Sequence, residues 1–123
     1  MLVLWRRVIS DLLIGKIGKR NGVEAIGVYS LSEARTAAEI LKPCVALVEI
    51  PLRQGEPALE ALKVCEEIKE VSAGCKTAIL CPEEDDESVQ ICIEAKRQGK
   101  IDDFLFYDST TVYLVSKIES LCP

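Results

Sequence analysis

The residue best placed for chemistry is Glu49, which follows the short apolar run of residues 45–48 and precedes a loop that contains Pro and Gly. A short run rich in Val and Leu is typical of a buried parallel strand. In open α/β sheets, functional groups gather just beyond the carboxyl ends of such strands. We therefore expect the Glu49 carboxylate to lie at a functional edge of a sheet.

Other reactive side chains close two similar apolar runs. Trp5, Arg6 and Arg7 stand together near the start of the chain, and Cys81 ends a later run. If these runs are strands of one sheet, their ends meet Glu49 at the same edge. There, a guanidinium group of Arg6 or Arg7 can bind the carboxylate through a charge-assisted hydrogen bond. The alternative is that both arginines are solvated at the start of a helix, while Trp5 fills the core or a pocket.

The cysteines are expected to act mainly as small buried hydrophobic residues, because no Cys-x-x-Cys pair is present and the cytoplasm is reducing. They are Cys44, Cys65, Cys75, Cys81, Cys92 and Cys122. A redox role is the alternative for Cys81, since a helix N-terminus can lower the pKa of a thiol. The acidic residues 83–87 oppose that effect.

Several kinds of functional site have no counterpart in the sequence. There is no histidine, which removes the commonest zinc ligand and the commonest general base. Neither a Gly-rich dinucleotide motif nor a P-loop is present. Residues 83–87 lack the spacing of a calcium loop and are expected to form a solvated loop before a helix, and the basic residues 15–20 a solvated helix face. We expect no metal, no cofactor and no enzymatic activity.

Length and composition indicate one globular domain over residues 1–123, which a longer chain could continue into an output domain. The chain is 49% hydrophobic, enough to bury a core. Its net charge of −5 argues against direct binding to nucleic acid or to an anionic membrane. No apolar run is long enough to span a bilayer and no signal peptide is evident, so a cytoplasmic location is expected.

Short apolar runs alternate with amphipathic ones along the whole chain. The runs that predict strands are residues 2–5, 23–29, 44–49, 76–81 and 103–107. The patterns that predict helices are residues 8–21, a segment from a Ser30 or Ser32 cap to Leu41, and residues 58–71, 88–98 and 110–121. This alternation predicts a flavodoxin-like, doubly wound α/β sandwich of three layers, with five parallel strands in the order 2-1-3-4-5.

The arrangement resembles the receiver domain of two-component response regulators. Lys42 and Pro43 precede the third strand, a carboxylate ends that strand, and residues 102–105 open the fifth strand with Asp-Asp-Phe-Leu. The resemblance covers essentially the whole chain. It implies that Glu49 takes the position of the aspartate that accepts a phosphoryl group in that family.

The resemblance also assigns the other reactive positions, and nearly all of them are altered. Trp5 and Arg6 lie where the family has the acidic pair that holds Mg²⁺. Cys81 replaces a Thr or Ser, and Tyr107 replaces a Lys, whereas the aromatic switch position keeps an aromatic residue, Phe104.

Phosphoryl transfer to a carboxylate needs a cation that neutralises the charge developing on the phosphoryl oxygens. Because that cation has no acidic pair to hold it, we expect a degenerate pseudo-receiver that is not phosphorylated. Two interpretations of Glu49 stay open. Its charge imitates a phosphorylated aspartate, or it is a structural carboxylate, solvated or paired with Arg6 or Arg7.

A pseudo-receiver is expected to work by binding a protein partner in a signalling pathway. The resemblance places the interaction surface on the fourth helix, fifth strand and fifth helix, which carry Phe104, Phe106, Tyr107 and Tyr113. Phe104 and Phe106 should share one side of their strand. A homodimer through this surface is a further expectation. The alternatives are a receiver that is still phosphorylated in a phosphorelay and a flavodoxin-like enzyme or small-ligand-binding domain.

Overall fold

The computed structural model of the protein describes residues 1–3, 13–15, 26–28, 31–51 and 55–121. Residues 13–15 are helical, in agreement with the predicted first helix, and the remainder of that helix lies outside the described residues. No helix in these ranges is long and apolar enough to cross a membrane.

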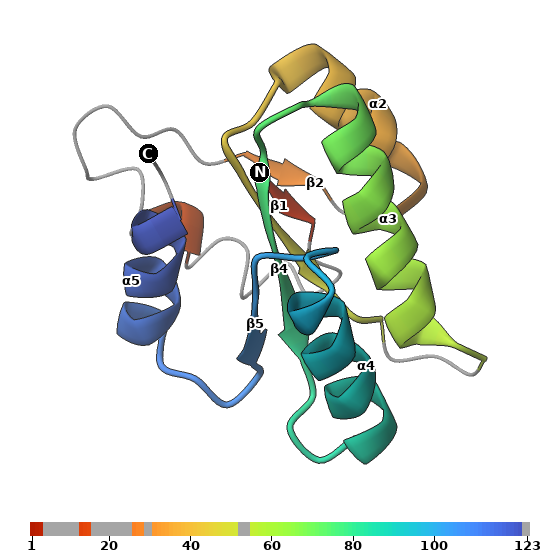
Figure 1. Ribbon diagram of the computed structural model, residues 1–123. Coiled ribbons are helices and arrows are strands. Elements are labelled where there is room, and N and C mark those ends of the chain that lie inside the picture. Colours follow the sequence, from red (N-terminus) through yellow and green to blue (C-terminus); the bar gives the residue numbers. More distant parts are fainter. Residues whose placement is uncertain (4–12, 16–25, 29–30, 52–54, 122–123) are drawn as a thin grey trace.

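The centre of the molecule is a five-stranded parallel sheet in the order β2-β1-β3-β4-β5, which confirms the predicted topology (Figure 1). Its strands are β1 (Leu2–Val3), β2 (Gly27–Val28), β3 (Val45–Glu49), β4 (Lys76–Cys81) and β5 (Asp103–Phe106). The predicted bounds of β4 agree with the structure at both ends, and residues 77–81 of this strand are buried. Strand β5 ends one residue earlier than predicted.

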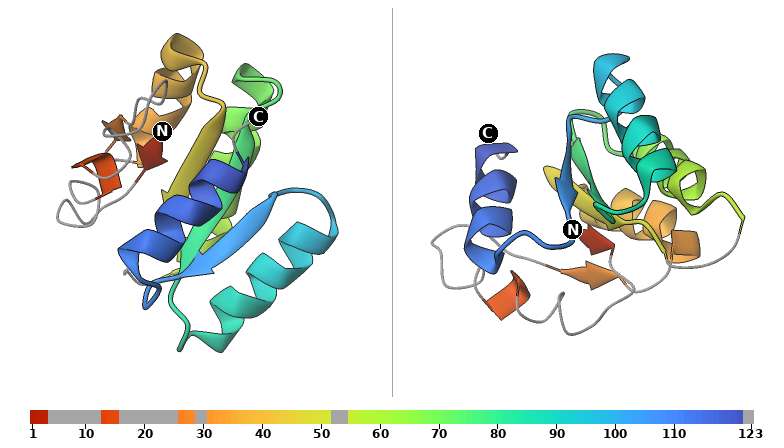
Figure 2. Two further views of the ribbon diagram at one scale, coloured as in Figure 1. Left: turned by 90° about the vertical axis from the view of Figure 1, so that its left-hand side faces the viewer. Right: turned by 90° about the horizontal axis from the view of Figure 1, so that it is seen from below.

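Helices cover both faces of the sheet, which makes the flavodoxin-like three-layer sandwich. The helices are α2 (Leu31–Leu41), α3 (Pro57–Val71), α4 (Asp86–Arg97) and α5 (Thr111–Leu121). Helix α5 lies on one face, and α2, α3 and α4 lie on the other (Figure 2). The first face also holds Leu13, which packs in one hydrophobic cluster with residues of α5.

Alternation along the central strands separates the two core layers. In β3, Ala46 and Val48 belong to the core beneath α2, α3 and α4. Val45 and Leu47 belong to the core beneath α5. Both sets are buried, as expected for a parallel strand covered on two faces. The alternation continues at the strand end, where it decides the direction of each candidate side chain.

Helix α4 begins at Asp86, two residues before the predicted start, because Asp85 caps it. The Asp85 carboxylate accepts hydrogen bonds from the Ser88 backbone N–H at 3.3 Å and from the Ser88 hydroxyl at 2.9 Å. These bonds satisfy donors that a helix start leaves open. The acidic residues 83–87 are exposed as predicted, but only residues 83–85 precede the helix, because Asp86 and Glu87 form its first turn.

Candidate functional site at the carboxyl edge of the sheet

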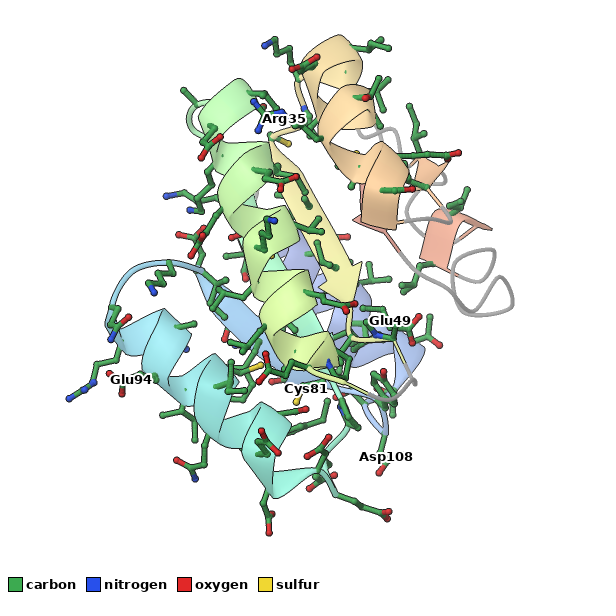
Figure 3. The ribbon with its side chains drawn as sticks, turned by 90° about the vertical axis from the view of Figure 1, so that its right-hand side faces the viewer. Arg35, Glu49, Cys81, Glu94 and Asp108 are labelled. Carbon is green, nitrogen blue, oxygen red and sulfur yellow. The ribbon has the colours of Figure 1, made fainter. Side chains whose placement is uncertain are left out.

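Glu49 and Cys81 end neighbouring strands at the same edge of the sheet, as predicted (Figure 3). Glu49 of β3 lies in register with Leu80 of β4, one residue before Cys81. Adjacent strands are about 4.8 Å apart, so these strand ends are close neighbours. Trp5, which was expected at this edge too, lies outside the described residues.

The side chain of Glu49 is buried, with 1% of its surface exposed. The interpretation of Glu49 as a solvated carboxylate is therefore wrong. By strand alternation, Glu49 follows Leu47 onto the α5 side of the sheet. A buried carboxylate is costly unless a donor or cation compensates it. Arg6 and Arg7, the predicted partners, lie outside the described residues, so the pairing stays a prediction.

Tyr107 spans the carboxyl edge. Its backbone N–H donates to the Cys81 carbonyl at 3.0 Å, which extends the ladder between β4 and β5 beyond the last strand residue. Its hydroxyl donates to the carbonyl of Ile50, the residue after Glu49. The phenol therefore reaches from β5 past the end of β4 to the end of β3. Sequence reasoning assigned Tyr107 to the position of a lost lysine and to the expected interaction surface, and it missed this contact.

The side chain of Cys81 faces the core layer beneath α3 and α4. Cys81 is fully buried there, and its Sγ lies 3.5 Å from the Pro82 carbonyl oxygen. Cys92 of α4 belongs to the same core cluster. Strand alternation puts Glu49 on the opposite face. Glu49 and Cys81 therefore share an edge of the sheet but face different core layers.

The predicted interaction surface divides into two parts. Phe104 and Phe106 do share one side of β5, with ring centroids 5.8 Å apart and an interplanar angle of 82°. Tyr107 packs instead against the core beneath α5. Tyr113 on α5 is 48% exposed, and the Lys117 ammonium lies 5.9 Å from the centre of its ring. Whether these residues form an interaction surface stays a prediction.

Asp103 joins the two helices that flank β5. Its carboxylate accepts hydrogen bonds from Lys96 of α4 at 3.0 Å and from Lys117 of α5 at 3.4 Å. Burial by itself would raise the pKa of Asp103, but Lys96, the Phe104 N–H and Lys117 together lower it below the usual value. The charges lie along an edge strand, where they discourage pairing with strands of other chains.

Asp102 performs a similar role at the amino edge of the sheet. Its Oδ2 accepts from the Lys69 ammonium and from the Thr77 backbone N–H, both at 2.8 Å. Burial opposes ionisation here too, but Lys69, Thr77 and Lys76 keep the pKa of Asp102 below the usual value. The sequence indicated Asp102 only as one of the residues that carry the family resemblance, with no structural role predicted for it. Its partners are far away in the chain, so no local pattern could reveal them.

No group of three or more His, Cys, Asp or Glu side chains that could hold a metal ion occurs within the described ranges. The positions that the resemblance assigns to the metal, Trp5 and Arg6, are not among those ranges. Of the predicted site residues, Glu49, Cys81 and Tyr107 lie at this edge within the described ranges. Glu49 is buried, and the Tyr107 hydroxyl bonds to the carbonyl of the next residue, Ile50.

No protein-family model and no curated protein sequence matches the chain. Solved structures do. A CheY-like response regulator receiver domain protein from Methanospirillum hungatei is 19% identical, with a TM-score of 0.74, and the match covers 98% of this chain and 90% of that one. The signal receiver domain of a modulated diguanylate cyclase from Desulfovibrio desulfuricans is 25% identical, with a TM-score of 0.70, and the match covers 98% and 89%.

A further similar structure, an adenylate cyclase from Rhodopirellula baltica, is 16% identical with a TM-score of 0.81. That match covers 98% of this chain and 83% of the other. The similarity extends over nearly the whole chain in each case, and it agrees with the strand order and with the two helical layers. The chain therefore has the fold of a response regulator receiver domain.

Proposed function

We propose that this protein is a receiver-like signalling domain that acts without being phosphorylated, by binding a protein partner. The observation that carries the proposal is the closed carboxyl edge. Glu49 is 1% exposed, and the Tyr107 hydroxyl donates to the carbonyl of Ile50 immediately after it. Both features support the proposal, because a buried carboxylate is poorly accessible to a phosphodonor.

The chemistry of the replaced positions supports the same conclusion. A phosphoryl group on Glu49 would carry roughly two negative charges at a buried position where the carboxylate carries one. A Lys ammonium could offset part of that charge, but the phenol of Tyr107 carries no positive charge. The phosphodonor would also need Glu49 to become exposed, which requires the residues after β3 to move and the Tyr107 bond to break.

The role of Glu49 in this proposal is to keep the domain in one conformation. A fixed carboxylate at the end of β3 and a bond from Tyr107 to Ile50 connect strands β3 and β5 across β4. A domain held in this way presents the same surface at all times. The domain has no enzymatic activity in this proposal. It is located in the cytoplasm, where signalling partners of receivers are found.

The surface proposed for the partner comprises the exposed residues of α4, β5 and α5. Ile93 and Tyr113 are 43% and 48% exposed, and Lys96 and Lys117 flank Asp103 between them. Aromatic and aliphatic groups surrounded by charges are common at the centres of protein interfaces. The partner is a second copy of this chain or another signalling protein. The Desulfovibrio neighbour suggests a third candidate partner, an output domain attached to the same chain.

A binding experiment tests this proposal directly. The purified domain is immobilised and exposed to native cell extract, and the proteins retained by the wild type are compared with those retained by Tyr113→Arg and Leu59→Arg. Leu59, on α3, is 42% exposed and is the matched control. We expect Tyr113→Arg to lose the specific partner and Leu59→Arg to keep it, with retention unchanged by acetyl phosphate. Retention that requires the phosphodonor would refute the proposal.

A further inference from the structure

The amino edge of the sheet places two cysteines at the starts of neighbouring strands. Cys44 immediately precedes β3, and Cys75 immediately precedes β4. The two strands are parallel, and Val45 is in register with Lys76 (Figure 1). The Lys76 N–H donates to the Cys44 carbonyl at 2.9 Å, so the ladder between the strands extends back to Cys44. Cys44 and Cys75 therefore lie opposite each other, one residue before the first registered pair.

Both side chains belong to the same face of the sheet. Cys75 is part of the core cluster beneath α2, α3 and α4, and so is Ala46 of β3. Cys44 precedes Ala46 by two residues and follows it onto this face by strand alternation. Adjacent strands are about 4.8 Å apart, which is within the Cα–Cα range of about 4.4–6.8 Å that a disulfide spans. The backbone thus presents the two thiols to each other at a distance suited to a covalent link.

Two side-chain hydrogen bonds hold the turns before β3 and β4 against each other. The Ser72 hydroxyl donates to the Pro43 carbonyl at 3.2 Å. The Lys42 ammonium donates to the Val71 carbonyl. Each bond joins a residue shortly before one cysteine to a residue shortly before the other. The two thiols therefore lie on segments whose separation is fixed by side-chain contacts as well as by the ladder.

The two thiols differ in their access to solvent. Cys44 is exposed and departs from the expectation of buried cysteines, whereas Cys75 is only 2% exposed. Both are reduced. Burial raises the pKa of the Cys75 thiol above its ordinary value, so this thiol stays protonated at neutral pH. A small oxidant in solution therefore reaches Cys44 first, and Cys75 is the neighbour that can react with the product.

We propose that Cys44 and Cys75 are a peroxide-reactive thiol pair, which closes into a disulfide between the starts of β3 and β4. The oxidant is of the peroxide class. In a reducing compartment, a disulfide of this kind is transient and serves redox sensing or catalysis. The pair lies at the edge of the sheet opposite to Glu49. The proposal therefore does not depend on the proposed function, and each can fail without the other.

The reaction balances as a two-electron oxidation. The Cys44 sulfur attacks one peroxide oxygen, the O–O bond breaks, and the departing oxygen leaves as water. The sulfenic acid formed on Cys44 is then attacked by the Cys75 sulfur. The S–S bond forms while the S–O bond breaks, and the hydroxide leaves as a second water with the proton of Cys75. Two thiols are oxidised, and the peroxide is reduced to two molecules of water.

Peptide mapping of the folded full chain tests the proposal. Trypsin cleaves after Lys and Arg except before Pro, so Cys44 is the single cysteine of residues 36–53 and Cys75 that of residues 70–76. The chain is treated briefly with hydrogen peroxide, its free thiols are blocked with N-ethylmaleimide, and it is digested without reductant. We expect a joined species whose mass is two hydrogens below the sum of the two peptides. Dithiothreitol should separate it again.

Controls in the same digest show whether the reaction is selective. Cys65 lies in residues 64–69, and Cys81 and Cys92 lie together in residues 77–96. All three are fully buried, so these peptides should keep reduced thiols and take up N-ethylmaleimide after unfolding. The intact protein should remain a monomer that has lost two hydrogens, because the link is formed within one chain.

Variants identify the two partners and their order. Cys44→Ser changes an exposed position and should abolish the joined species, whereas Cys65→Ala, the matched control in the same core layer as Cys75, should retain it. Cys75→Ala should leave a sulfenic acid on Cys44 that dimedone traps. If Cys75→Ala does not fold, the wild-type map and Cys44→Ser decide.

Three results would overturn the proposal. The first is oxidation of Cys44 to a sulfenic or sulfinic acid in the wild type while Cys75 stays free. The second is a disulfide from Cys44 to any other cysteine, including Cys44 of a second copy. The third is the absence of any change at Cys44 at peroxide concentrations that oxidise free cysteine in the same solution.

Discussion

At the scale of single residues, Tyr107 shows what the sequence alone could and could not indicate. The apolar run before Tyr107 predicted its position at the end of the fifth strand. The family resemblance indicated that it replaces a lysine. The bond from its hydroxyl to Ile50 joins residues that are 57 positions apart in the chain. No local pattern encodes such a contact, because it depends on the order of the strands and on the length of a phenol.

Replacing Tyr107 with Phe removes only the hydroxyl that bonds to the Ile50 carbonyl. We expect the free energy of unfolding to fall by about 1–2 kcal/mol, since a half-buried acceptor loses its donor while the ring still packs. Urea denaturation measures the change. Tyr113→Phe is the control, and because its side chain is exposed it should change the free energy by less than about 0.5 kcal/mol. Equal effects of the two substitutions would mean that the Tyr107 bond is unimportant.

Asp102 provides a prediction on pH. Its pKa in the folded protein is lower than the ordinary 3.8, despite burial, because of Lys69, Thr77 and Lys76. A lowered pKa means that the carboxylate stabilises the fold above its unfolded pKa and loses this effect as the pH falls through the folded pKa. Asp102→Asn should lower the free energy of unfolding by about 1 kcal/mol at neutral pH. The difference from wild type should disappear in acid.

Urea unfolding across the range from about pH 7 to about pH 3 measures this difference. Asp108→Asn, at an exposed position on the other edge of the sheet, is the matched control. A difference between wild type and Asp102→Asn that stays constant over the whole range would show that the carboxylate acts through its shape and not through its charge.

At the scale of elements, the apolar runs of the strands were predicted more accurately than the helix starts. Residues 76–81 form β4 as expected, because the apolar stretch of residues 78–81 is buried on both faces of the sheet. Helix α4 begins earlier than expected because Asp85, within an acidic run that seemed uniform, has the geometry of a cap. The identity of the capping carboxylate depends on backbone angles that the sequence does not specify.

Removing this cap is a test at the level of the helix. Asp85→Ala leaves the Ser88 backbone N–H and hydroxyl without their acceptor, and we expect a loss of about 1 kcal/mol in the free energy of unfolding. Asp86→Ala changes the next residue, which is also acidic, and we expect it to lower the free energy of unfolding by only about 0.3 kcal/mol. Thermal and urea denaturation measure both variants. Similar losses for the two would indicate a general charge effect at the helix start.

At the scale of the whole molecule, the topology could be predicted because each unit of strand and helix has its own hydrophobic pattern, and right-handed crossovers leave few arrangements of five units. The directions of the site residues were harder to predict. Cys81 was placed at the correct edge, but a strand that is apolar on both sides does not show which face of the sheet each of its side chains takes. The predicted partners of Glu49, Arg6 and Arg7, lie outside the described residues.

The central claim is that this receiver fold does not take up a phosphoryl group. The most direct measurement is the intact mass of the full chain after incubation with acetyl phosphate and millimolar Mg²⁺, next to an ordinary receiver domain as positive control. Trp5, the single tryptophan of the sequence, provides a second signal in the same samples when beryllofluoride replaces the phosphodonor. We expect no phosphoryl adduct and no saturable change in Trp5 fluorescence. A phosphoryl adduct that maps to Glu49, accompanied by saturable quenching, would contradict the claim and indicate a working phosphorelay receiver.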